Sequence, residues 1–336
     1  MKIPFEKKYR QKYYSLLEEV FESNFLADGP KNSEFENKFG KLHKLKASTI
    51  SGGGPGLLAL LEYVGVRNKE VIVPTNTFVA TPLAVMYAGG KVVFADCKRE
   101  DLCIGLENIK KVVTNKTKAI IVVHIGGHIA FDIEEIKEFC EKKNIFLIED
   151  CAHAHGSSYK GKKAGSFGIG GAYSFYATKT LPIGSGGMVV SQSQEVIDFV
   201  NKYKIYGKDI SNNSFPINGF NFRMSEIEAT FGLIQIGRFN EILTWKKKLA
   251  KKFDEIFDKR VFLPKNMESG YYKYIVFEPI KEQTGAVYDL LCSDLWNYNG
   301  EFPNSKWVSQ NHWCAPIYYG WDGADLPTNL IAKRLR

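Results

Sequence analysis

The chain has 336 residues, 44% of them hydrophobic and 24% charged, as in ordinary globular proteins that hold one large core and a smaller lobe. Its formal net charge of +8 would suit a phosphorylated or nucleotide-linked ligand, but no basic stripe with interleaved aromatic residues is present, which argues against nucleic-acid binding. The N-terminus has no apolar leader and no apolar run approaches membrane-spanning length, so we expect a cytoplasmic protein that does not enter a membrane.

The cysteines and histidines show no metal-binding pattern. The six cysteines are scattered without a CxxC pair, so we expect reduced thiols and neither a zinc site nor a disulfide framework. Four histidines lack metal-like spacing to carboxylates or cysteines and are interpreted as structural: His43, His124, His128 and His312. We therefore expect no metal.

The first predicted element with a chemical meaning is a glycine-rich helix start. Ser51–Gly56 leads directly into the apolar run Leu57–Leu61, which a buried helix would contain. Glycines such as Gly53 and Gly54 leave backbone amides exposed at the positive end of that helix, which makes a phosphate cradle. The run lacks the Lys-Ser/Thr of a P-loop and the GxGxxG spacing, so a nucleotide fold of either type is disfavoured.

Four apolar runs of strand length follow in chain order. Because they are continuously apolar, they predict strands buried on both faces, with covering helices between them. The runs are Val71–Val73, Val92–Phe94, Ala119–Val123 and Ile145–Ile148.

The clearest helix among these strands begins at Asp132. Its carboxylate is predicted to cap the first turn, with Glu135 in the capping-box position, while Ile133, Ile136 and Phe139 form an inward stripe. Strand, helix and strand in this order form a right-handed parallel unit.

The pattern changes after Gly165. Two short strands, near Ala172–Phe175 and Met188–Ser191, are predicted on either side of a glycine turn. From about Phe222 helical periodicity dominates, and the run Lys246–Lys248 is interpreted as a solvated helix face. We predict a large domain over residues 1–240 and a small α+β domain over residues 241–336.

The most informative residue is Lys179, between the run Tyr173–Thr178 and the Gly184–Gly187 turn. A lysine among apolar and hydroxyl side chains can lose its proton and become a nucleophilic amine. The carboxylates Glu149 and Asp150 end a buried strand, where one of them can keep a ring nitrogen protonated. Together these residues describe a pyridoxal phosphate (PLP) site, although each alone is more often a surface or capping group.

The order of these parts resembles the DegT/DnrJ/EryC1/StrS family of PLP-dependent sugar aminotransferases. The resemblance runs from about Phe25 to Trp245, with a fainter echo near Pro316 and Asp325–Pro327. Its motifs are Val73–Thr81, Ile148–Gly156, Ser174–Gly187 and Gly219–Met224. It implies an α/β fold of type I, with a mostly parallel sheet flanked by helices and a smaller α+β C-terminal lobe.

The resemblance also implies a role for each matching residue. Lys179 would form the Schiff base with PLP, Asp150 would pair with the pyridine nitrogen and Phe78 would stack on the ring. Ser174, with the amides around Gly53 and Gly54, would hold the phosphate. Asn221 would reach the phosphate of the neighbouring subunit's cofactor, which makes the protein a homodimer with shared active sites.

Several positions depart from the family pattern. His153 stands where a glutamine usually meets the phenolic oxygen of PLP, and we predict that it contacts the ring, with a packed structural histidine as the alternative. His155 has no clear chemical task and is interpreted as structural. Gly54 and Pro55 replace a threonine and a small residue, so backbone amides must supply the missing phosphate contact.

The C-terminal part departs further. Pro316–Tyr318 replaces a Pro-x-His near the substrate, and the sequence ends at Lys333–Arg336, before the family's last strand and helix, so we expect an unusual acceptor pocket. Arg223 could bind a carboxylate or a phosphate, or form a structural ion pair at a subunit interface.

The resemblance implies amino transfer from L-glutamate to a keto-sugar, with a nucleotide-linked sugar as the first choice. A small keto phosphate, a cyclic ketone and a regulatory protein that kept the fold without turnover remain alternatives. A dehydratase of the same family is disfavoured, because those relatives replace the Schiff-base lysine with histidine.

Overall fold

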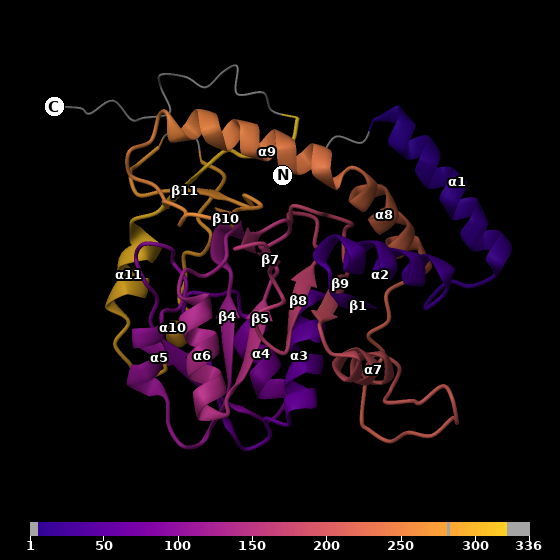
Figure 1. Cartoon of the computed structure of the whole chain (residues 1–336), viewed down its shortest axis with the longest axis horizontal. Helices are drawn as coiled ribbons and strands as arrows, with labels where there is room; N and C mark the ends of the chain where they lie inside the picture. Colours follow the sequence, from indigo (N-terminus) through magenta and orange to yellow (C-terminus); the bar gives the residue numbers. More distant parts are fainter. Residues whose placement is uncertain (1–5, 281–282, 321–336) are drawn as a thin grey trace.

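A seven-stranded sheet forms the centre of the protein in a computed structural model, which describes residues 6–280 and 283–320. The strand order is β1-β9-β8-β5-β4-β2-β3 (Figure 1). The strands are β1 (Lys46–Ile50), β2 (Glu70–Pro74), β3 (Lys91–Ala95), β4 (Thr117–Val123), β5 (Phe146–Asp150), β8 (Gly170–Ser174) and β9 (Gly187–Ser191). All six apolar runs predicted as strands are therefore strands of this sheet.

The sheet is mostly parallel, as predicted. β2 pairs in parallel with β3 and β4, and β5 pairs in parallel with β4 and β8. Only β9 runs against its neighbours, because the chain returns beside β8 after a short glycine-containing connection and pairs antiparallel with both β8 and β1. The carboxyl ends of the parallel strands consequently point to one edge.

The continuously apolar strands contribute side chains to two hydrophobic cores, because successive side chains of a strand point to opposite faces of the sheet. In β2, Ile72 belongs to one cluster, whereas Val71 and Val73 belong to the other. The first core contains buried side chains of α2 (Pro30–His43), α5 (Leu106–Val112), α6 (Ile133–Lys143) and α8 (Glu226–Gly237). The second contains those of α3 (Gly53–Val64), α4 (Ala80–Tyr87) and α7 (Gln194–Tyr203).

Helix α6 has the predicted inward stripe but not the predicted cap. Ile133 and Ile136 are fully buried. The carboxylate of Asp132 makes no capping hydrogen bond. It instead accepts the backbone N–H of Leu106 at 3.0 Å and pairs with Lys98, so the prediction of a capping box here was wrong.

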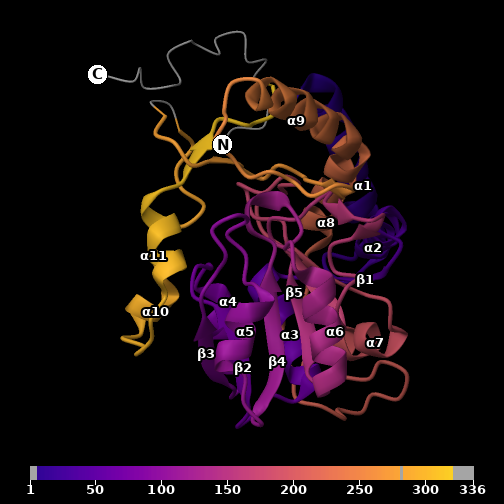
Figure 2. The same cartoon turned by 60° about the vertical axis from the view of Figure 1, so that its left-hand side comes forward.

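The remaining elements lie at one end of the sheet and along its side. Helix α9 (Phe239–Asp254) crosses above the carboxyl ends of the parallel strands, and α10 and α11 lie beside the sheet (Figures 1 and 2). The other helices are α1 (Lys7–Ser23), the 3-10 turn η1 (Ile125–Gly127), α10 (Cys292–Leu295) and α11 (Pro303–Gln310). Two small sheets comprise β10 (Met267–Glu268) with β6 (Ser158–Tyr159) and β7 (Lys162–Lys163), and β11 (Tyr274–Val276) with β12 (Trp313–Ala315).

The lysine run on α9 is not wholly solvated. Lys246 is only 1% exposed, and its Nζ donates hydrogen bonds to the carbonyl oxygens of Tyr271 at 2.8 Å and Ile317 at 3.0 Å. Burial lowers the pKa of Lys246 to about 7. Lys246 therefore joins α9 to the chain near β11 and β12. The prediction that the lysine run is a solvated helix face was wrong for this residue.

Two sequence predictions are not decided by this architecture. The domain boundary at residue 240 stays a prediction, and buried residues beyond it, such as Cys292 and Phe302, pack in the same core as α3. The motif echo at Asp325–Pro327 lies outside the described residues. Among the described helices, none combines the length and apolarity needed to span a membrane.

Candidate active site

The predicted site residues gather where β5 and β8 end. Asp150 is the last residue of β5 and Ser174 is the last residue of β8. Lys179 follows β8 in a turn in which its backbone N–H donates to the carbonyl oxygen of Tyr176 at 2.9 Å. Because parallel strands present their carboxyl ends at one edge, the topology places residues from separate segments at this edge.

Lys179 has the properties of a reactive amine. Its pKa is lowered to about 8, first by burial and further by the positive charge of Lys273, while the negative charge of Asp150 opposes the shift. Its Nζ lies 4.8 Å from the centroid of the Tyr272 ring. A larger fraction of this amine is therefore unprotonated near neutral pH than of an exposed lysine.

Asp150 is held by two donors. Thr81 Oγ1 donates to its Oδ2 at 2.9 Å, and the backbone N–H of Ala152 donates to its Oδ1 at 3.0 Å. Burial raises the pKa of this carboxyl, and the two hydrogen bonds act in the opposite direction. Each carboxylate oxygen can accept more than one hydrogen bond, so Asp150 can still receive a ring N–H.

The glycine-rich helix start lies against Ser174. A Cβ atom added to Gly53 would stand 3.1 Å from the Ser174 Cβ, and one added to Gly54 would stand 3.5 Å from the Ala80 Cβ. Gly53 opens α3, and no side chain caps this helix end. The first-turn amides of α3 and the Ser174 hydroxyl therefore share one small space, which suits a phosphate group.

Phe78 lies between β2 and α4, the helix whose Thr81 contacts Asp150. Its side chain is 74% exposed, unusual for a phenylalanine. An exposed aromatic ring three residues before Thr81 suits a flat partner such as a pyridine ring.

His153 stacks on Tyr272, with ring centroids 4.1 Å apart. Among the described residues its buried Nδ1 has no hydrogen-bond partner. Burial, with help from the charges of Lys179 and Lys273, lowers the pKa of His153 well below its usual value, so the ring is neutral. The orphaned nitrogen is a polar group available to a ligand.

Tyr272 is a site residue that sequence reasoning missed. It belongs to the segment before β11, almost a hundred residues after Lys179. Its ring lies beside the Lys179 amine and stacks on the His153 ring. Its hydroxyl is 3.4 Å from Thr178 Oγ1. The only signal was the general tyrosine richness of the C-terminal part, because no motif surrounds Tyr272.

Asn221 is not part of this group within the protomer. It is exposed, and its Oδ1 accepts a hydrogen bond from Arg223 Nε at 2.9 Å. Its backbone pairs with that of Ile205. A contact between Asn221 and a neighbouring subunit's cofactor therefore stays a prediction, as does the role of Arg223.

His155 and His43 lie in an aromatic cluster. The His155 ring is 5.1 Å from Tyr173 and 5.8 Å from Phe175, and His43 stacks on Phe39 at 4.1 Å. His43 Nδ1 is 2.9 Å from the Phe39 carbonyl oxygen. The interpretation of both histidines as structural stays a prediction.

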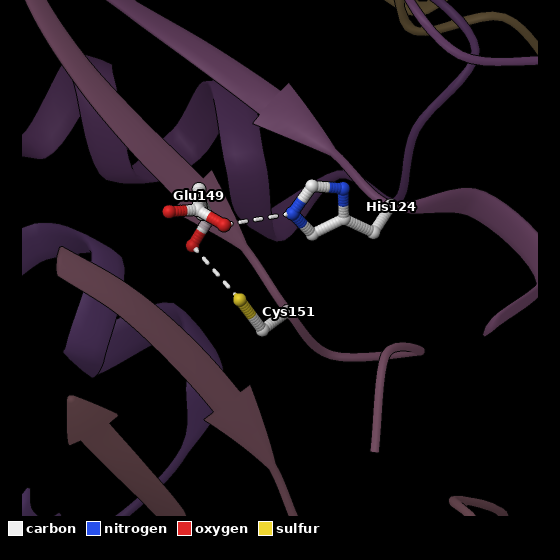
Figure 3. A group of neighbouring side chains, drawn as sticks. All are labelled: His124, Glu149 and Cys151. Carbon is white, nitrogen blue, oxygen red and sulfur yellow. Dashed lines mark hydrogen bonds and ion pairs between the residues drawn. The ribbon is translucent and has the colours of Figure 1, made fainter. Parts of the chain in front are cut away.

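Glu149 and Cys151, which flank Asp150 in the sequence, form a buried group with His124, shown in Figure 3. Its ligand-type atoms are within 4.8 Å of one another, a proximity that the sequence spacing did not suggest. His124 Nδ1 accepts the backbone N–H of Ala130 at 3.1 Å, so Nε2 carries the proton that it gives to Glu149 at 2.9 Å. Burial raises the pKa of the Cys151 thiol well above its usual value.

Glu149 uses both oxygens to hold the following loop. Besides His124, it accepts three backbone N–H groups at 2.7–2.8 Å, from Gly165, Phe167 and Gly168. We call these four contacts the Glu149 brace. Since its acceptors are already engaged, we interpret the group as structural, and the absence of a metal site stays a prediction.

The residues present fit PLP. They include a carboxylate for a ring nitrogen, an exposed ring for stacking, a phosphate-sized space that a Cβ on Gly53 would crowd, an orphaned histidine nitrogen and an amine with a lowered pKa.

Fold and site together define a transferase of fold type I. The chain matches the DegT/DnrJ/EryC1/StrS aminotransferase family over residues 8–291 and belongs to that family. Its membership implies PLP as the cofactor and confirms the predicted family, fold class and aminotransferase activity.

Several curated relatives carry sugar-aminotransferase names. GDP-perosamine synthase of Escherichia coli O157:H7 is 36% identical over 72% of this chain and 67% of its own length, and that of Vibrio cholerae is 36% identical over 65% and 60%. The dTDP-3-amino-3,4,6-trideoxy-alpha-D-glucose transaminase of Micromonospora megalomicea is 29% identical over 80% and 74%. These names agree with the prediction of a sugar aminotransferase.

Solved structures show the same fold at low identity. The aminotransferase TlmJ of Streptoalloteichus hindustanus superposes with a TM-score of 0.87 at 24% identity, over 95% of this chain and 94% of its own. A DegT DnrJ EryC1 StrS aminotransferase of Brucella abortus gives 0.84 at 23% identity, over 93% and 91%.

The Glu149 brace predicts a large cost for Glu149→Gln. An amide would turn N–H donors towards backbone N–H groups that now donate to a carboxylate, so the free energy of unfolding should fall by about 2–4 kcal/mol. Urea unfolding measures the change. Glu141→Gln, in which an exposed carboxylate of α6 loses its pairing with Lys137, should cost at most about 0.5 kcal/mol and is the matched control. Equal costs would contradict the brace.

The lowered pKa of Lys179 predicts the pH dependence of PLP uptake. Only the neutral amine attacks an aldehyde, so the rate for cofactor-stripped protein, trapped with borohydride on the Lys179 peptide, should rise through pH about 8 and then level off. Exposed lysines, with ordinary pKa values of about 10.4, should continue to gain label at higher pH. A Lys179 rate still rising at pH about 10 would contradict the shift.

Proposed function

We propose that this protein is a PLP-dependent aminotransferase that moves the amino group of L-glutamate to a nucleotide-linked keto-sugar. The observation that carries the proposal is the arrangement of Lys179 and Asp150. An amine with a pKa of about 8 and a buried carboxylate held by Thr81 and Ala152 lie at the same end of the sheet. Membership in an aminotransferase family supports the proposal that this arrangement is the active site.

PLP, when bound, withdraws electrons from the substrate Cα and so makes its proton easier to remove. The amides at the start of α3 and the Ser174 hydroxyl would hold its phosphate, and Phe78 would cover one ring face. Asp150 would accept the ring N–H and keep the nitrogen protonated. His153 Nδ1 would face the phenolic oxygen.

Lys179 would do the proton transfer. Its Nζ, in the neutral form that burial favours, would take the proton from the Cα of the amino donor and later return a proton to the product. The negative charge of Asp150 keeps the pKa of Lys179 from falling further. The same amine therefore remains basic enough to accept a proton.

Support for a nucleotide-linked sugar comes from the relatives. The E. coli and V. cholerae proteins are named for a GDP-linked product and the Micromonospora protein for a dTDP-linked one. The formal net charge of +8 suits a diphosphate. Because the chain matches only part of each relative, the identity of the acceptor belongs to the proposal.

Half-reactions test the proposed function. L-glutamate should convert bound PLP to pyridoxamine phosphate and release 2-oxoglutarate, and Lys179→Ala should do neither while keeping its fold. UDP-, GDP- and dTDP-linked keto-sugars should then restore PLP, with kcat/KM of at least about 10⁴ M⁻¹s⁻¹ for the true acceptor.

Small keto phosphates and unlinked cyclic ketones are the control acceptors in the same assay. If only these compounds are turned over, the proposal of a nucleotide-sugar acceptor is wrong, whereas the assignment as an aminotransferase still holds. Bound PLP that glutamate leaves unchanged would indicate a protein without turnover.

We further propose that the active enzyme is a homodimer with shared sites. Large apolar side chains are exposed close in sequence to Lys179 and Asn221: Tyr176 is 58% exposed and Phe220 is 55% exposed. Such side chains are enriched in protein interfaces. A partner that covers them could bring its own Asn221 to the phosphate beside Ser174.

Complementation between two variants tests the shared site. Lys179→Ala and Asn221→Ala should each be severely impaired as homodimers, because each damages a different half of the site. Co-expression should restore roughly a quarter of wild-type activity, since half of the dimers are mixed and each mixed dimer has one intact site. The separately purified homodimers are the control. Activity no higher than theirs would contradict a shared site.

A further inference from the structure

Two lysine side chains flank one aromatic ring in the active site. Lys179 Nζ lies 4.8 Å from the centroid of the Tyr272 ring, and Lys273 Nζ lies 5.8 Å from the same centroid. His153 stacks on this ring at 4.1 Å. We call His153, Lys179, Tyr272 and Lys273 the Tyr272 cluster. Lys179 and His153 were predicted from the sequence, whereas Tyr272 and Lys273 were not, and Lys273 has no role in the proposed chemistry.

Lys273 is held in place by neutral groups alone among the described residues. Its Nζ donates to the carbonyl oxygen of Thr284 at 2.6 Å and is 3.4 Å from Thr284 Oγ1. Within residues 6–280 and 283–320, no carboxylate forms a salt bridge with it. An ammonium group has three N–H donors, so the Thr284 contacts leave at least one for another acceptor.

A cation in this setting is costly without a negatively charged partner. The side chain is half-buried, and burial lowers the pKa of Lys273, which shows that the charged form has lost solvation. The backbone fixes its position, because the Lys273 N–H donates to the Gly126 carbonyl oxygen at 2.9 Å. Lys273 is thus a preorganised donor and not a free surface lysine.

Space is available beside Lys273. It lines a cavity of about 240 Å³ together with His128, Ser269 and Tyr271, whereas Lys179, His153 and Tyr272 are not among the lining residues of that cavity. The carboxylate in that cavity, Asp254, is already engaged. It accepts Arg260 Nε at 2.7 Å and the Tyr274 hydroxyl at 2.7 Å.

We propose that Lys273 binds an anionic oxygen group of a substrate while the reacting part of that substrate lies at Lys179. The proposal rests on the proposed function. Placing both ammonium groups around Tyr272 gives the site one amine for chemistry and one for recognition. A carboxylate or a phosphate would supply the charge that Lys273 lacks, through a charge-assisted hydrogen bond.

The anion has two possible sources, the amino donor and the acceptor. L-glutamate carries carboxylates, and a nucleotide-linked sugar carries a diphosphate. A Lys273→Gln variant separates them, because it removes the charge and keeps a polar side chain. Lys273→Arg keeps the charge, and Lys273→Met keeps the packed stem if the glutamine variant folds poorly. Lys248→Gln, on the exposed face of α9, removes the same net charge and is the matched control.

Three measurements on PLP-loaded protein form the test. The first is the concentration of L-glutamate that half-saturates its half-reaction, by rapid mixing. The second is the affinity for UDP, GDP and dTDP, by calorimetry. The third is the affinity for inorganic pyrophosphate, which needs no turnover and cannot use the phosphate cradle that PLP fills.

We expect Lys273→Gln to weaken one substrate arm and the pyrophosphate arm by about 10- to 100-fold, Lys273→Arg to recover most of that loss, and Lys248→Gln to change neither. Weaker binding of glutamate would identify the donor carboxylate as the group that Lys273 binds. Weaker binding of the nucleotides would identify the acceptor phosphates. Lys273 variants that lose stability but bind every probe as Lys248→Gln does would overturn the proposal and make Lys273 a structural tether to Thr284. Wild-type protein that binds pyrophosphate through Lys273 but does not react with glutamate would instead refute the proposed function.

Discussion

The buried carboxylate of Glu149 is the constraint on which the geometry of the site depends. It accepts hydrogen bonds from His124, which follows β4, and from three backbone amides of the loop before β8, and the Glu149 side chain is fully buried. Asp150 is the next residue, so the direction of its side chain follows from how firmly Glu149 is held. A charge placed in the core is costly, and four donors are what makes it tolerable here. The same contacts that satisfy Glu149 thereby orient the residue after it.

The pKa of Lys179 depends on two opposing electrostatic effects. Burial and the charge of Lys273 disfavour the ammonium form, whereas the charge of Asp150 favours it. A fully unopposed burial would make the amine a weak base, and an exposed lysine would be protonated almost all of the time. The balance gives a pKa of about 8, close to where a group that both attacks and transfers protons works well.

The segment before β11, which belongs to the predicted small domain, places side chains beside Lys179 and His153. Tyr272 places one ring under both Lys179 and His153, and its neighbour Lys273 adds a second cation. Lys246 on α9 holds this segment through a hydrogen bond to the carbonyl oxygen of Tyr271, and it donates another to that of Ile317. A substrate that contacts Lys273 while it reacts at Lys179 would consequently lie between the carboxyl end of the sheet and this segment.

The sequence alone predicted the strands of the sheet, the helix at the glycine run and the proximity of Lys179 and Asp150, because continuous apolar runs, glycine positions and short motifs are local signals. It did not determine the Asp132 contacts, the burial of Lys246 or the position of Tyr272. Each of these depends on which distant segment lies opposite: Leu106 and Lys98 for Asp132, Ile317 for Lys246, and His153 for Tyr272. The polarity of a side chain indicates which kind of partner it needs, but it does not indicate where in the chain that partner lies. The tertiary structure decides the partner, because only the fold brings residues a hundred positions apart within hydrogen-bonding or stacking distance.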